Sequence, residues 1–145
     1  MALSGNMNGK LATLAGLVSF LTVPGLTAQQ DDSPMTKEMK ASSLALKELR
    51  KIPRGDWEAM AKAVRNAQQA LLKSMSFVPT LVQEMPEGPE KAKAAASARQ
   101  VLGSCYVALS ELELAYLAKD QDRVNAAMEK VKEIKKEGHQ SFADD

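Results

Sequence analysis

The sequence has very few of the residues that carry metal and covalent chemistry. Its 145 residues include one cysteine and one histidine, and aromatic residues make up only 4%. One cysteine cannot form an intrachain disulfide or a paired-cysteine metal site. One histidine excludes a two-histidine zinc site and the paired Glu-x-x-His motifs of di-iron proteins. No Gly-rich phosphate loop or Ser-His-Asp arrangement is visible, so the sequence predicts no catalytic role.

An excess of charge of one sign is also missing. Lys and Arg number 19 and Asp and Glu number 18, which gives a formal net charge of +1. A protein that binds nucleic acid needs a basic excess to neutralise phosphates. The balance therefore predicts that nucleic acid is not a partner, and the length suits a single domain.

Residues 1–28 have the organisation of a secretory signal peptide. One basic residue, Lys10, precedes the apolar stretch 11–23, and the segment ends at Ala28 before the polar residues 29–32. The apolar stretch is too short to span a bilayer, so cleavage is favoured over a membrane anchor. The sequence therefore predicts an exported, periplasmic protein. Its mature chain, residues 29–145, would be one domain without stable membrane insertion.

The mature chain shows the hydrophobic spacing of four helices and no useful run that alternates with period two. Each predicted helix begins at a capping residue or a proline, namely Ser33, Asp56, Pro89 and Asp120. The connections between them are residues 52–55, the proline-containing stretch 79–89 and residues 119–120. Short first and last connections around a longer middle one predict an all-α, antiparallel, up-down-up-down four-helix bundle.

His139 is the single imidazole of the chain. Considered alone, a histidine near a helix C-terminus is typical of a solvated cation that interacts favourably with the helix dipole. In an up-down bundle, however, the first helix begins at the end where the last helix finishes. Met39 lies six residues after Ser33 and His139 six residues before Asp145, so both lie roughly 9 Å in from that end. A thioether and an imidazole that face each other across a bundle core can be the two axial ligands of haem iron.

Three segments resemble the cytochrome b562 family, small exported four-helix cytochromes that hold haem b between a methionine and a histidine. Residues 39–51 resemble the family's first helix, in which the ligand methionine precedes a Leu-Lys-x-x-Glu-like run. Residues 58–89 resemble its second helix and the following loop. Residues 138–142, Gly-His-Gln-Ser-Phe, resemble its ending, in which the histidine is the second ligand. The resemblance covers nearly all of residues 33–142.

The resemblance implies that Met39 and His139 are the axial ligands of one haem per chain. Related cytochromes attach haem through cysteines four residues and one residue before the histidine. Lys135 and Gly138 stand at those positions here, so the haem would be a non-covalent haem b. Met35, one turn before Met39 on the same face, is an alternative ligand in the first turn of the helix.

The chain also departs from the family around the predicted haem. Gly138 stands where the family has an aromatic residue. The hydrophobic spacing predicts that the last helix fades near Phe142, and the cost of a glycine inside a helix leaves an end at Glu137 as the alternative. The third helix lacks the phenylalanines that commonly wall the haem and has Val101, Ser104 and Cys105 nearby. Cys105 lies on the apolar face of that helix and has no partner for redox chemistry, so we expect it to pack in the core.

The sequence thus predicts a periplasmic electron-transfer cytochrome. An iron with both axial positions filled leaves no position for a substrate, so the protein would carry electrons and not turn over a small molecule. The sequence does not identify the redox partner proteins, and we expect a monomer or a weak dimer. Two alternatives stay open. One is a haem-free bundle with a structural or stress-protective role in the cell envelope, and the other is a gas-binding five-coordinate haem from which Met39 is absent.

Cleavage of the signal peptide can be tested directly. We expect the exported protein to begin at Gln29 or within a few residues of it, because Ala28 precedes the change from apolar to polar residues. Mass spectrometry of the exported protein gives its N-terminus. Recovery of an exported chain that keeps residues 1–28 would contradict the prediction.

Overall fold

A computed structural model describes residues 32–142, so the predicted signal peptide, residues 1–28, lies outside the described residues. The described part is all-helical and contains no strand. Its helices are α1 (Pro34–Glu48), α2 (Trp57–Ser74), α3 (Thr80–Gln83), α4 (Pro89–Leu117) and α5 (Gln121–Phe142). The predicted all-α class is confirmed, and the single-turn α3 is an addition to the four predicted helices. None of the helices in this part of the chain is long and apolar enough to cross a membrane.

The helices begin where their capping residues predict. The Ser33 hydroxyl accepts a hydrogen bond from the Thr36 N–H at 3.1 Å, and Pro34 occupies the first turn of α1. The carboxylate of Asp56 accepts one from the Ala59 N–H at 3.1 Å at the start of α2. The Asp120 carboxylate does the same for the Arg123 N–H at 3.1 Å before α5. Each such cap stabilises its helix by about 1 kcal/mol, because it satisfies a backbone donor that has no partner inside the helix.

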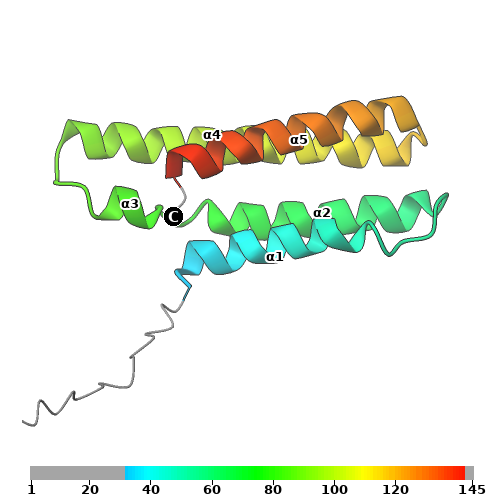
Figure 1. Cartoon of the computed structure of the whole chain (residues 1–145), viewed down its shortest axis with the longest axis horizontal. Helices are drawn as coiled ribbons and strands as arrows, with labels where there is room; N and C mark the ends of the chain where they lie inside the picture. The colour runs from blue at the N-terminus through cyan, green and yellow to red at the C-terminus, as the bar shows by residue number, and fades with distance from the viewer. Residues whose placement is uncertain (1–31, 143–145) are drawn as a thin grey trace, which may run out of the picture. The chain divides into compact units, whose positions relative to one another are not determined.

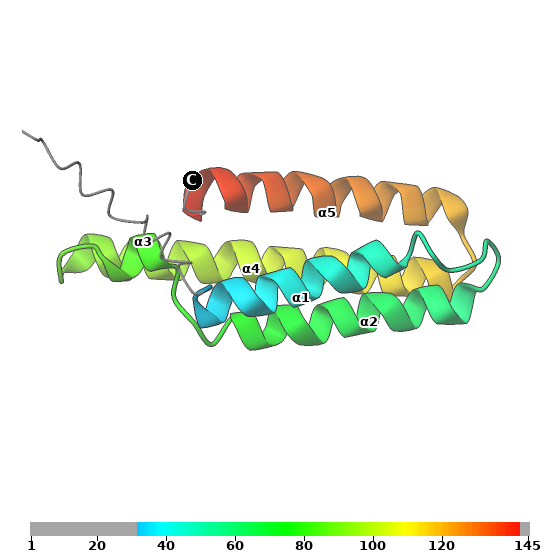
Figure 2. The same cartoon turned by 60° about the horizontal axis from the view of Figure 1, so that its bottom comes forward.

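The four long helices pack side by side in the order α1, α2, α4, α5. α1 packs along α2, α2 along α4 and α4 along α5, whereas the described parts of α1 and α5 have no comparable backbone packing. Figure 1 shows α1 with α2 in one layer and α4 with α5 in the other, and Figure 2 shows α5 standing apart from α1. In both views the start of α1, the end of α2 and the end of α5 lie toward the same end, which we call the methionine end because Met35, Met39 and Met75 belong to it.

The hydrophobic core is formed mainly by α2, α4 and α5. Its largest fully buried apolar side chains are Val64 and Leu71 of α2 and Leu109 and Leu112 of α4, and α5 adds the buried residues Val124, Ala127 and Val131. α1 contributes much less, because Met35, Met39 and Leu46 are only partly buried and Leu44 is exposed. The one buried residue of α1 is Ser42, whose hydroxyl donates a 3.0 Å hydrogen bond to the Ala67 carbonyl. α1 is therefore attached through α2 and leaves apolar surface on its other side.

Gly138 does not end α5: the predicted end of the helix near Phe142 is confirmed, and the alternative end at Glu137 does not occur. The helix continues to Phe142. A Cβ atom at position 138 would lie 3.2 Å from Cγ1 of Val101, so the missing side chain lets α5 approach α4 closely. This packing offsets the cost of about 1 kcal/mol that a glycine adds inside a helix.

The contact at Gly138 predicts coupled effects of two substitutions. Gly138→Ala should raise the free energy of unfolding by less than the roughly 1 kcal/mol expected from helix propensity, because the new methyl group would meet Val101. In a Val101→Ala background the same change should approach that full gain. Urea unfolding of the four proteins forms a double-mutant cycle. An equal effect of Gly138→Ala in both backgrounds would show that the contact with Val101 is unimportant.

Candidate functional site

A hydrogen bond between α1 and α5 sets the level at which the two predicted ligands lie. Nζ of Lys135 donates to Oγ of Ser43 at 3.3 Å. Met39 is one turn from Ser43 toward the methionine end, and His139 is one turn from Lys135 toward the same end (Figure 1). A turn of either helix advances about 5.4 Å. Because a lysine side chain is about as long as one helical turn, the bond places Met39 and His139 within about one turn of the same level of α1 and α5.

The two residues also belong to the helix edges that the Lys135–Ser43 hydrogen bond connects. Residues four apart lie on one face of a helix, so Met39 shares the face of Ser43 and His139 shares that of Lys135. Met128, eleven residues before His139, lies three turns away on the same edge of α5 and packs against the core. We call the surfaces around Met39, Ser43, Lys135 and His139 the α1–α5 side.

The predicted ligands differ in exposure. Met39 is half-buried and packs against the core, whereas His139 is exposed in the last turn of α5. Within residues 32–142, His139 makes no hydrogen bond and no ion pair. The solvated-cation interpretation of this histidine therefore remains compatible with its surroundings. Met35 is also half-buried, but it lies a further turn toward the start of α1, beyond the level of His139.

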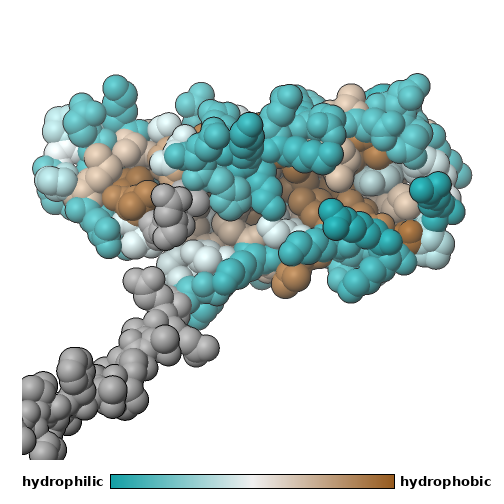
Figure 3. Space-filling view, viewed as in Figure 1, coloured by the Kyte–Doolittle hydropathy of each residue, from teal (hydrophilic) through white to brown (hydrophobic). Residues whose placement is uncertain are grey.

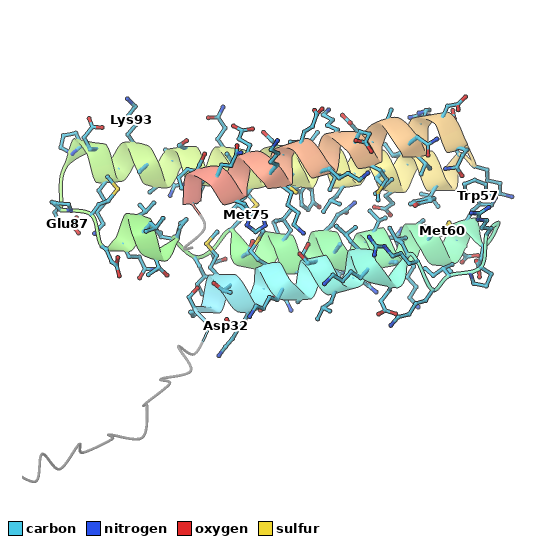
Figure 4. All side chains as sticks on the ribbon, viewed as in Figure 1. Asp32, Trp57, Met60, Met75, Glu87 and Lys93 are labelled. Carbon is cyan, nitrogen blue, oxygen red and sulfur yellow. The ribbon has the colours of Figure 1, made fainter. Side chains whose placement is uncertain are left out.

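The surroundings of the α1–α5 side are largely apolar. Figure 3 shows hydrophobic side chains gathered between the polar outer surfaces of α5 and α1. Partly buried apolar residues of α1, α4 and α5 that pack against the core are Met35, Met39, Leu46, Cys105, Met128 and Ile134. Met75 lies at the end of α2 near the space between the two layers (Figure 4). The site combines a thioether, an imidazole and apolar walls.

Lys135 reaches both α1 and the neighbourhood of Cys105 on α4. Burial raises the pKa of the Cys105 thiol, and the positive charge of Lys135 partly opposes this by favouring the thiolate. The half-buried thiol packs against the core, as the sequence predicts.

Lys135 and Ser43 were not among the predicted site residues. The sequence feature that could have identified them is their spacing from the predicted ligands, because Ser43 follows Met39 by four residues and Lys135 precedes His139 by four.

The residues of the α1–α5 side fit the ligand set of a haem iron. Methionine and histidine together are an axial pair found in cytochromes, and both are present here at one level of the fold. Among the residues that the structure describes, no group of three or more His, Cys, Asp or Glu side chains could hold a metal ion. The donor atoms and the apolar surroundings suit a haem. His139 is exposed, however, so its imidazole does not lie in a preformed pocket.

A separate groove lies at the opposite end of α2. Trp57 and Tyr116 pack there with ring centroids 6.3 Å apart at an interplanar angle of 50°. The groove has a volume of about 560 Å³ and is bordered by Lys62, Arg65 and Leu117, among others. Trp57 and Met60 mark this end in Figure 4, far along α2 from Met75. The groove is therefore distinct from the α1–α5 side.

The environment of Cys105 predicts slow reaction with thiol reagents at neutral pH. The thiolate is the reactive form, and the raised pKa keeps the thiol protonated. The pH at which the reaction rate rises should be higher for the folded protein than for the urea-unfolded chain. Lys135→Gln should move the folded profile to still higher pH, because it removes the charge that favours the thiolate. Rates against pH for both proteins check this, and identical folded and unfolded profiles would disprove it.

No family model, curated protein or solved structure matches this chain.

Proposed function

We propose that the four long helices form an antiparallel, up-down-up-down four-helix bundle of the cytochrome b562 type. Two observations support this arrangement. The helices pack in the order α1, α2, α4, α5, and both the α1–α2 and α4–α5 connections are short. The longer α2–α4 connection contains α3, which packs against α4. This order leaves α1 and α5 as the first and last helices on adjoining edges.

We further propose that the protein is a periplasmic electron-transfer cytochrome that binds one haem b non-covalently. Met39 and His139 would be its axial ligands. The observation that supports the proposal is the hydrogen bond from Lys135 to Ser43, because Met39 and His139 each lie one turn from this bond toward the methionine end. The apolar surroundings on the same side supply a suitable environment for the macrocycle.

A bound haem would supply reversible one-electron chemistry. The contributions of the chain are ligation, orientation and the exclusion of water. The Met39 thioether and the His139 imidazole would fill both axial positions, which leaves no position for a substrate. Met128 and Leu46 are partly buried apolar residues on the same two helices, about three turns from His139 and two turns from Met39. The ammonium group of Lys135, one turn from His139, places a positive charge at the rim of the site.

One observation favours the haem-free alternative, a structural or stress-protective bundle of the cell envelope. His139 is exposed and has no partner among the described residues, as expected for a solvated cation at a helix C-terminus. The two proposals differ in a simple property. A cytochrome takes up haem with a low-spin spectrum, whereas the haem-free protein remains colourless when haemin is added.

Substitution of the candidate ligands tests the cytochrome proposal. We expect the parent protein to bind one equivalent of haemin and to become more stable to heat, because haem binds the folded state in preference to the unfolded chain. His139→Ala should lose most of the haem affinity, because it removes the more basic ligand. Met39→Ala should retain haem but with a high-spin or water-ligated ferric iron. Visible spectra and thermal melts of each variant measure both properties.

Two methionine variants serve as controls. Met35→Ala should keep the low-spin spectrum, because Met35 lies beyond the level of His139. Met60→Ala, a partly buried methionine near the other end of α2, should also keep it (Figure 4). Loss of the low-spin spectrum in Met35→Ala but not in Met39→Ala would show that the methionine assignment is wrong. Undiminished haem affinity in His139→Ala would refute the proposed site.

A further inference from the structure

α4 carries apolar residues on its outer face as well as on its buried face. Among the described residues, the exposed large hydrophobic side chains include Val107 at 53%, Leu114 at 58% and Leu117 at 52%. These three are spaced by seven and three residues, so they share one face of the helix. The core-facing residues Leu109 and Leu112 lie on the opposite side and are fully buried.

The outer face follows a heptad pattern. Steps of three and four residues connect Gln100, Gly103, Val107, Ser110, Leu114 and Leu117, which we call the outer stripe. The stripe contains no charged residue, and small residues alternate with large apolar ones over most of its length. Hydrophobic positions at this spacing are typical of a helix that packs against another helix along its length.

No contact among the described residues requires a glycine at position 103. A glycine inside a helix costs about 1 kcal/mol relative to alanine, and at Gly138 the close approach of Val101 requires it. A Cβ atom at position 103, in contrast, would have no atom within 4 Å. The missing side chain becomes useful if a second helix approaches α4 at this point.

Neutralised charges border the outer stripe on both sides. Arg65 of α2 and Glu113 of α4 form an ion pair with an N–O distance of 2.6 Å. On the α5 side, Lys130 pairs with Glu111 at 2.9 Å. An apolar centre with a polar rim is the usual composition of a protein–protein interface. Because the rim charges cancel, this face does not select a strongly acidic or strongly basic partner.

We propose that the outer stripe is the interface of a homodimer in which α4 packs antiparallel to α4 of a second copy around a two-fold axis. The stripe is complementary to itself in one register. Leu114 then lies against Gly103 of the second copy, and Val107 against Ser110 of the second copy. Two of the three large side chains thus face a small one, as close packing of two helices requires, and Leu117 lies against Gln100 of the second copy at the edge of the contact.

The ends of the helix in this register bring opposite charges near one another. Arg99, one turn before Gly103, falls at the C-terminal end of α4 of the second copy, where Lys119 and Asp120 of that copy are neighbours in the chain. The negative end of the helix dipole favours the Arg99 cation there, whereas the Lys119 and Asp120 charges offset each other. The steric match of large to small residues is therefore the main argument for a second copy of this chain, and the α1–α5 side stays outside the interface.

Sedimentation of the purified protein over a range of concentrations tests the proposal. The parent should approach twice the chain mass as the concentration rises. Leu114→Glu should weaken dimerisation by roughly 100-fold or more, because each dimer would bury two unpaired carboxylates. Leu44→Glu is the matched control, since Leu44 of α1 is equally exposed at 58% but lies outside the stripe. Helix content by circular dichroism verifies that each variant is folded.

A parent protein that stays monomeric at every concentration would overturn the proposal. So would a Leu114→Glu variant that dimerises as tightly as the parent, or a Leu44→Glu variant that is weakened equally. The register has its own test, because Gly103→Leu and Leu114→Ala should each weaken the dimer. Combined in one chain, they exchange the large and small residues and should restore at least part of the affinity. A double variant as weak as the sum of its two changes would refute the contact between Leu114 and Gly103.

Discussion

The hydrogen bond from Lys135 to Ser43 joins two helices that otherwise have little contact. At 3.3 Å, and with an exposed lysine as its donor, it adds at most a modest free energy of folding, about 1 kcal/mol. The three other pairs of neighbouring long helices are held by extensive packing. Separation of α1 from α5 therefore costs less than separation of any other neighbouring pair. An inserted planar group would meet the least resistance on this side, where both candidate ligands lie.

The composition of α1 explains why this side is weakly closed. The helix buries one residue, Ser42, and directs that side chain to a carbonyl of α2. Its longer apolar side chains, including Met39 and Leu46, remain partly buried. Methionine is flexible and adapts to irregular spaces, so such a helix face can pack against either a neighbouring helix or a bound group. Because such a face can pack in either way, the packing of α1 is explained without a haem. Haem binding therefore has to be measured.

The sequence predicts the helices better than it predicts the details of the site. Ser33, Asp56 and Asp120 mark helix starts because capping is a local interaction. The hydrophobic spacing also predicts the end of the last helix near Phe142. It does not show why the helix passes through Gly138, because the cost of that glycine is offset by Val101, which is 37 residues away and is brought close only by the tertiary structure. Counting residues from the chain ends indicates that Met39 and His139 share a level. It cannot indicate that Lys135 contacts Ser43 or that His139 is exposed, because both depend on how closely α1 and α5 approach.

The core-facing side and the outward-facing side of α4 place different demands on its sequence. Toward the core, Leu109 and Leu112 must be large enough to fill the space between three helices. Toward the outside, Gly103 and Ser110 must be small enough for a second helix to approach. A monomer needs only the first set, and a polar outer face would then give better solubility. α4 has apolar residues on both faces, and a Cβ atom at Gly103 would meet no atom within 4 Å. Both features are explained if α4 is buried on both sides in the assembled protein. The α1–α5 side would remain accessible in that assembly, so dimer formation and ligand binding would not compete for the same surface.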